Sequence, residues 1–121
     1  MKAKKKENEN NITEGKQSHE IDIVMCELQG VSKKAKKSFV IPGHIRVKKN
    51  DELIWCTKDT GAKLIFPKNE LFEMQQCEIK NKDKIKLTVK DSARKGRYTY
   101  AVITDDGEFA EGGSFPVIIV E

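Results

Sequence analysis

A strict alternation of apolar and polar residues is the feature that most constrains this chain. Residues 84–90 (KIKLTVK) carry Ile85, Leu87 and Val89 at every second position, with lysine or threonine between them. Successive side chains of a β-strand point to opposite faces, so this spacing predicts a strand with one buried and one solvated face. The same two-residue period recurs at residues 20–28, 44–48, 53–57 and 97–103. The chain is therefore predicted to form sheets.

Turn signals separate these segments. Residues 115–120 (FPVIIV) are apolar almost throughout, as expected of a strand that is covered on both faces, and residues 64–66 form a shorter apolar run. We interpret residues 33–37 (KKAKK) as a basic loop. Seven to eight short strands at regular intervals predict an all-β fold, an antiparallel Greek-key β-sandwich.

One short helix is predicted within this sandwich, at residues 69–77 (NELFEMQQC). Asn69 is a favourable N-cap, and Leu71, Met74 and Phe72 would face inward.

The chain has 121 residues, which predicts one domain preceded by an arm. Residues 1–18 are polar and show no apolar periodicity, so we expect a disordered basic arm followed by a domain at residues 19–121. The first seventeen residues hold five lysines and three glutamates, which leaves eighteen basic and sixteen acidic residues elsewhere. This balance does not by itself indicate a nucleic-acid-binding protein.

The cysteine pattern bears on location. Cys26, Cys56 and Cys77 are widely spaced, and no pair has the C-x-x-C spacing of a zinc or redox site. No apolar segment follows the basic N-terminus, and no stretch is long enough to span a bilayer. We therefore expect reduced thiols in a cytoplasmic protein.

Two motifs resemble the cupredoxin family. Residues 39–55 (FVIPGHIRVKKNDELIW) resemble its pattern of F-x-P, an I-x-V strand and a G-D turn before a V-x-W strand, with Asn50 in place of the glycine. Residues 96–102 (GRYTYAV) resemble its G-x-Y-x-Y-x-C strand, which precedes a ligand loop and a closing strand. The resemblance extends from about Phe39 to the end of the chain and implies a cupredoxin-like sandwich.

The resemblance also locates the positions of the copper ligands. Cupredoxins hold copper between a histidine from the middle of the chain and a cysteine, a histidine and a weak axial ligand from the last loop. These positions fall on Lys63, Val102 and Asp105, with the axial position near Glu108 to Ala110. None of these residues is a type I copper ligand. The resemblance therefore implies a sandwich without a blue-copper site and without a cofactor.

The carboxylates of the last loop have a second possible interpretation. Asp105, Asp106, Glu108 and Glu111 form an oxygen-rich cluster of the kind that attracts calcium, but TDDGEFAEGG lacks the alternating spacing of a calcium loop. We favour an acidic loop in solvent. If the two former ligand loops still meet, Lys63 and Asp105 are predicted to form a partly exposed ion pair.

The sequence gives little support for catalysis. It contains no nucleophile elbow, P-loop, dinucleotide fingerprint or zinc-protease motif. We interpret Trp55, Tyr98 and Tyr100 as packing residues, and we expect Tyr98 to hydrogen-bond back to the turn at residues 91–96.

The leading functional hypothesis is a non-catalytic binding or assembly module whose partner is another protein. The contact would use an exposed sheet edge or the last loop, with Asp106 and Glu111 as contact residues. One alternative is an anionic-surface binder for nucleic acid or acidic lipid, using lysines of residues 2–6, 33–37 and 48–49. A second alternative is a non-blue metal site at the carboxylate loop or His44.

Overall fold

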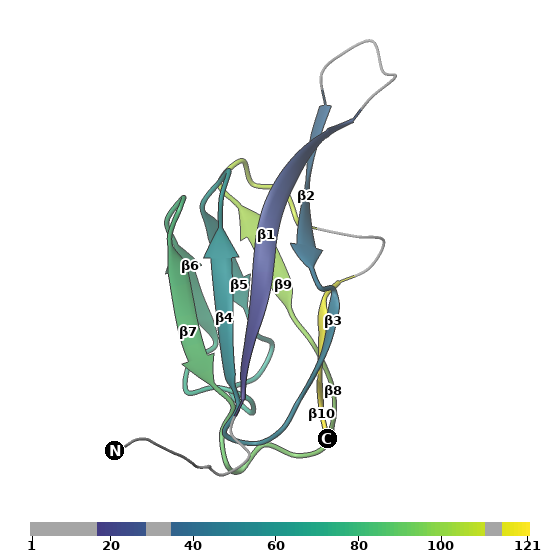
Figure 1. The fold of residues 1–121 in the computed structure, drawn as a ribbon, viewed down its shortest axis with the longest axis vertical. Helices are drawn as coiled ribbons and strands as arrows, with labels where there is room; N and C mark the ends of the chain where they lie inside the picture. The colour runs from purple at the N-terminus through teal and green to yellow at the C-terminus, as the bar shows by residue number, and fades with distance from the viewer. Residues whose placement is uncertain (1–16, 29–34, 111–114) are drawn as a thin grey trace, which may run out of the picture.

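The computed structural model describes residues 17–28, 35–110 and 115–121, which form ten strands in two layers (Figure 1). We call the four-stranded sheet the front sheet. Its strands lie in the order β2 (Ala35–Ile41), β1 (Ser18–Leu28), β4 (Glu52–Thr57) and β7 (Lys84–Thr88). The predicted all-β sandwich is confirmed.

The rear layer consists of two three-stranded sheets. One has the order β3 (His44–Val47), β10 (Val117–Val120) and β8 (Gly96–Thr99). The other has the order β6 (Gln76–Ile79), β5 (Ala62–Ile65) and β9 (Ala101–Thr104). Only Tyr100 separates β8 from β9, so one segment of chain joins the two sheets.

Most strand pairs are antiparallel, but two are parallel. β1 runs parallel to β4, and β3 runs parallel to β10. The inner strands of these two sheets, β1, β4 and β10, thus each have one parallel and one antiparallel neighbour. This mixture differs from the purely antiparallel sandwich that the alternation predicts, because periodicity does not report strand direction.

The core lies between the two layers and centres on Trp55 of β4. Its ring packs edge-on against Phe66, Phe72 and Tyr100, with ring centroids 5.8 to 6.0 Å apart. The indole Nε1 of Trp55 donates a hydrogen bond to the Tyr100 hydroxyl at 3.1 Å. The alternating exposure along β4 and β7 follows from the two-residue period of the sequence.

Asp51 holds the beginning of β1 against the β3–β4 turn. Its carboxylate is buried and accepts hydrogen bonds from the Gln17 and Lys48 backbone N–H groups and from the His19 ring, at 2.9 to 3.0 Å. Burial alone would raise the pKa of Asp51, but the hydrogen bonds, that from His19 foremost, lower it below its ordinary value.

The predicted helix at residues 69–77 is wrong. Residues 67–75 form turns and bends, and Gln76–Ile79 form strand β6, which pairs with β5. The neighbouring side chains of Leu71 and Phe72 are both buried, whereas Met74, expected to face inward, is 37% exposed. Two adjacent inward side chains fit an irregular segment folded onto the core.

Two further expectations concern segment boundaries. The basic loop expected at residues 33–37 is partly a strand, since β2 begins at Ala35 and Lys37 pairs with Cys26. Residues 33 and 34 lie outside the described part of the chain. The expected arm also lies outside it as far as residue 16, and β1 already begins at Ser18.

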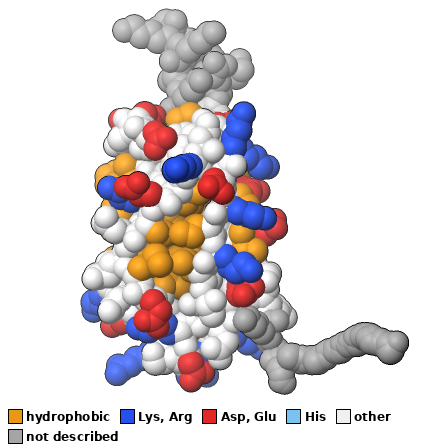
Figure 2. All heavy atoms as spheres, turned by 90° about the vertical axis from the view of Figure 1, so that its left-hand side faces the viewer, with side chains coloured by type: hydrophobic (Ala, Val, Ile, Leu, Met, Phe, Trp, Pro, Cys, Tyr) orange, Lys and Arg blue, Asp and Glu red, His pale blue; other side chains and the backbone are white. Residues whose placement is uncertain are grey.

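The strands β6 and β7 are edge strands of the two layers and lie together on one side of the molecule. Figure 2 shows this side, where hydrophobic side chains gather at the centre with charged side chains around them. Cys77 of β6 and Ile85 of β7 are partly buried and pack against the core. Within the described ranges, the structure contains no helix that is long and apolar enough to cross a membrane.

Candidate functional site

The positions that the cupredoxin resemblance assigns to copper ligands lie on β5, on β9 and in the turn after β9. Val102 of β9 is fully buried and lies opposite the equally buried Leu64 of β5. Lys63 lies on the other face of β5, because inward and outward side chains alternate along this strand. The structure therefore does not bring Lys63 and Val102 together. The nearest inward-facing position before Leu64 is Ala62.

Small residues fill the interior at this end of the sandwich. Ala62 lies opposite Thr104, and the backbone N–H of Ala110 donates a hydrogen bond to the Val102 carbonyl at 2.7 Å. Ala62, Thr104 and Ala110 are all buried, and none supplies an imidazole, a thiolate or a thioether. The sequence resemblance missed Ala62, because counting residues from Trp55 takes no account of which face of β5 a side chain occupies.

Asp105 anchors the end of β9 to the β4–β5 turn. Its carboxylate accepts a hydrogen bond from the Gly61 N–H at 3.1 Å, and its own N–H donates to the Gly61 carbonyl at 3.1 Å. A Cβ atom at Gly61 would lie 2.7 Å from this carboxylate and 2.9 Å from the Ile79 carbonyl oxygen. The close approach requires glycine at this position.

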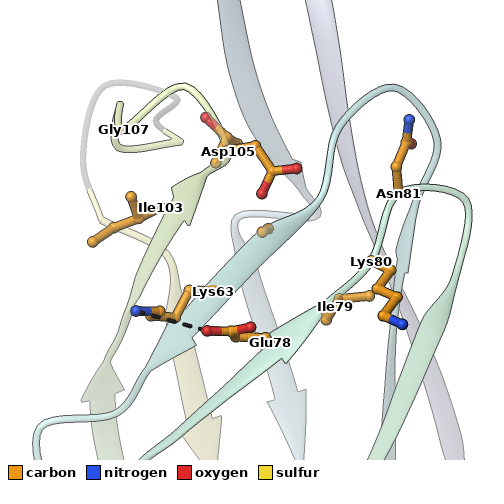
Figure 3. A pocket seen from close by; sticks show the side chains of 10 residues that line it. Lys63, Glu78, Ile79, Lys80, Asn81, Ile103, Asp105 and Gly107 are labelled. Carbon is orange, nitrogen blue, oxygen red and sulfur yellow. Dashed lines mark ion pairs between the residues drawn. The ribbon is translucent and has the colours of Figure 1, made fainter.

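The expected ion pair between Lys63 and Asp105 is not formed. The Lys63 ammonium lies 3.9 Å from the Glu78 carboxylate of β6, and the Asp105 carboxylate faces Gly61 instead (Figure 3). Lys63 and Glu78 occupy directly opposite positions in the β5–β6 pair. Strand register thus provides Lys63 with a nearer anionic partner.

The acidic loop folds back on β9 as a tight hairpin. The Thr104 N–H donates to the Glu108 carbonyl at 2.9 Å, and Gly107 adopts a left-handed φ of 85° at the tip. The Thr104 hydroxyl and the Glu108 N–H donate hydrogen bonds to Asp106 and lower the pKa of its carboxyl. The side chains of Asp106 and Glu108 remain exposed. Glu111 lies outside the described residues.

A shallow depression of about 410 Å³ lies beside this hairpin, on the outer face of the β6–β5–β9 sheet (Figure 3). Lys63, Glu78, Lys80, Ile103 and Asp105 contribute to its lining. Its charged side chains come from β5, from β6 and the residue that follows it, and from the turn after β9.

The described residues include no group of three or more histidine, cysteine, aspartate or glutamate side chains placed to hold a metal ion. His44 is exposed at the beginning of β3, and His19 bonds Asp51. Cys26, Cys56 and Cys77 are unpaired.

The three aromatic residues assigned to packing lie in or against the core. Trp55 and Tyr100 are buried, and burial raises the pKa of the Tyr100 hydroxyl, which therefore stays protonated and bonded to Trp55. Tyr98 is half-buried, and its hydroxyl donates to the Arg94 carbonyl at 2.6 Å. This is the hydrogen bond back to the turn that the sequence predicts.

An exposed aromatic pair lies next to the hairpin and was not predicted. Phe109 follows the hairpin tip and forms an isolated bridge with Ile103 of β9. Its ring contacts that of Phe115 edge to face, with centroids 5.5 Å apart, and each side chain is about half exposed (49% and 48%). The sequence gives only a weak signal for this pair, since a phenylalanine next to a strand is usually a core residue.

The two layers define the chain as a β-sandwich, and solved structures define the type of sandwich. A proline mutant of amicyanin in its reduced Cu(I) form at pH 4 is 18% identical over 91% of this chain and 86% of its own, with a TM-score of 0.57. A pseudoazurin from Sinorhizobium is 18% identical over 87% of this chain and 74% of its own, with a TM-score of 0.52. The chain thus has a cupredoxin-like fold.

Sequence comparisons add no closer assignment. No family model matches the chain, and no curated protein matches it. At 18% identity the structural likeness concerns the fold, and function has to be argued from the residues of this chain.

Proposed function

We propose that this chain is a non-catalytic protein-binding module on a cupredoxin-like sandwich without a type I copper site, and that it acts in the cytoplasm. The observation that carries the proposal is the exposed pair Phe109–Phe115 beside the acidic hairpin. Two contiguous aromatic rings are costly to leave in water and are characteristic of the centres of protein interfaces.

The chemistry around the pair suggests the nature of the partner. The exposed side chains of Asp106 and Glu108 come just before Phe109 in the hairpin, so the aromatic pair has acidic neighbours in the chain. An apolar centre with an acidic rim is complementary to a protein surface with an apolar pocket and basic residues around it. The inward-facing Ala62, Val102 and Ala110 offer no metal donor that would favour electron transfer instead.

The test is affinity capture from the native lysate with three forms of the protein. The wild type is expected to retain a partner that the double variant Phe109→Ser/Phe115→Ser loses. The matched control is Met74→Ser, which removes an exposed hydrophobic side chain from the segment between β5 and β6 and should retain the partner.

Two results would count against the proposal. Equal retention by the wild type and the double variant would exclude the aromatic pair as the contact. Capture of nucleic acid or acidic lipid that weakens steeply between low and moderate salt would favour the anionic-surface binder.

A further inference from the structure

The outer face of the front sheet carries its charges in separate columns. β1 presents Glu20 and Asp22, the acidic column. β4 presents Ile54 and Cys56, the apolar column. β7 presents Lys84 and Lys86, the basic column. The neighbouring residues Ile21, Leu53 and Leu87 point into the core, which places all six side chains on the outer face. In Figure 1 the front sheet lies nearest the viewer, and no described element covers these three strands.

Strand register aligns the three columns in two rows. Glu20 lies beside Ile54, which lies beside Lys86. Asp22 lies beside Cys56, which lies beside Lys84. Neighbouring strands are about 4.8 Å apart, so the acid and the base of one row are separated by about 10 Å and do not meet within the sheet.

The contacts among the described residues leave these charges largely unpaired. Among the described residues, Glu20, Asp22 and Lys84 form no ion pair within 4 Å, and Lys86 lies 3.9 Å from Glu52. The Cys56 thiol lies between the columns: burial raises its pKa, Glu20 and Asp22 raise it further, and Lys84 opposes them. These three strands therefore present an acidic column and a basic column on either side of an apolar one, with β2 lying beyond the acidic column.

We propose that this face binds the same face of a second copy of the chain, forming a two-fold symmetric dimer. If the two-fold axis runs along β4, then β4 of one protomer lies over β4 of its partner, and β1 of one protomer lies over β7 of its partner. Glu20 then meets Lys86 across the interface and Asp22 meets Lys84, twice each, while Ile54 and Cys56 pack at the centre.

Charge selects this arrangement over the other symmetric one. A two-fold axis running across the strands would place the acidic column over the acidic column and the basic over the basic, which is repulsive. The strands of two aligned sheets cross at about 30°. A two-fold axis along the mean strand direction allows this crossing angle, because the axis bisects the angle between the two sets of strands. Glu52, which lies near the axis, is directed towards Lys86, so the two copies of this carboxylate do not face each other without a counter-charge.

This interface differs from the one proposed above. Phe109 bridges to β9 of the rear layer, whereas the charged columns lie on the front sheet. The dimer can therefore be tested independently of the aromatic pair.

Sedimentation equilibrium at low salt tests the dimer through charge reversal. Lys84→Glu/Lys86→Glu makes both outer columns acidic, and Glu20→Lys/Asp22→Lys makes both basic. Each double variant is expected to weaken self-association more than about tenfold. Mixing the two variants should restore association, because each acidic column then faces a basic one. Lys68→Glu/Lys95→Glu, which reverses two exposed lysines elsewhere, should leave the dimer unchanged.

A second measurement does not depend on these variants. In a Cys26→Ser/Cys77→Ser background, Cys56 lies next to its own copy across the axis, so a short bis-maleimide should link two chains. Adding Cys56→Ser should abolish the product. A wild-type protein that remains monomeric at all concentrations, a mixture that fails to associate, or the absence of a Cys56-linked dimer would overturn the inference.

Discussion

At the scale of single residues, Asp51 makes the most consequential polar contact in the described chain. It is buried, yet its carboxylate joins the segment before β1, the turn before β4 and the ring of His19. The sequence indicated only a turn at this position. Nothing in the local pattern revealed that the carboxylate reaches back by more than thirty residues, because such a contact depends on how β1 and β4 pair.

The lowered pKa of Asp51 predicts acid-sensitive stability. A carboxyl whose pKa is lower in the folded state than in the unfolded state stabilises the fold at pH values above its unfolded-state pKa, near 3.8. That stability is lost as the pH falls through the folded-state pKa. Asp51→Asn should therefore flatten the decline of the free energy of unfolding below about pH 4. At pH 7 it should cost about 1–3 kcal/mol, because one carboxylate oxygen becomes an amide NH2 and the donors that bonded to it lose their acceptor.

Urea unfolding of the wild type and Asp51→Asn between pH 3 and 7 would measure both effects, within the usual range of carboxyl titration. The control is Glu73→Gln, which removes an exposed carboxylate and should change neither the slope nor the stability. Parallel pH profiles for the wild type and Asp51→Asn would contradict the assignment.

At the scale of elements, the hairpin after β9 is held to the β4–β5 turn by Asp105 and Gly61. Gly61→Ala would place a Cβ atom 2.7 Å from the Asp105 carboxylate and 2.9 Å from a backbone oxygen. We expect a loss of about 1–3 kcal/mol in the free energy of unfolding, since backbone has to shift to relieve the contact. Gly43→Ala is the matched control, because its nearest neighbour would lie at an ordinary 3.8 Å. Equal stability of the two variants would show that the space around Gly61 accommodates a Cβ atom and would contradict this prediction.

Prediction from sequence was uneven between elements, for physical reasons. β7 was predicted because its lysines and aliphatic residues alternate without interruption. β6 was missed because Gln76 and Glu78 leave only Cys77 and Ile79 to mark its inward face, which is too short a pattern to outweigh a plausible helix cap at Asn69. Propensity and capping are local, whereas pairing with β5 stabilises β6 through residues distant in sequence.

The candidate site was predictable in place but not in geometry. Val102 and Asp105 lie on β9 and in the turn that follows it, as the resemblance implied. The side on which Lys63 lies, its pairing with Glu78, and the exposure of Phe109 and Phe115 all depend on register and on the folded-back hairpin. A sequence pattern does not contain that information.

At the scale of the whole molecule, the described residues that fill the cupredoxin-like sandwich where β9 meets its hairpin are Ala62, Val102, Thr104 and Ala110, which carry no imidazole, thiolate or thioether. We predict that the protein shows no intense visible thiolate-to-copper absorption band after it is incubated with Cu(II) and unbound copper is removed. Val102→Cys should also lack the band, because the inward-facing neighbours Ala62 and Thr104 supply no imidazole. Absorption spectroscopy and metal analysis would measure both, and a strong blue band in the wild type would contradict the geometry.

The position of β10 has a consequence for how the chain is made. β10, at residues 117–120, lies between β3 and β8 and provides the backbone partner for both. A nascent chain that has not yet emerged from the ribosome beyond Val117 leaves these two strands without their shared neighbour. Translation can therefore supply the front sheet early, whereas the β3–β10–β8 sheet closes only after synthesis has passed β10. Until then the nascent chain exposes apolar surface of the kind that chaperones cover.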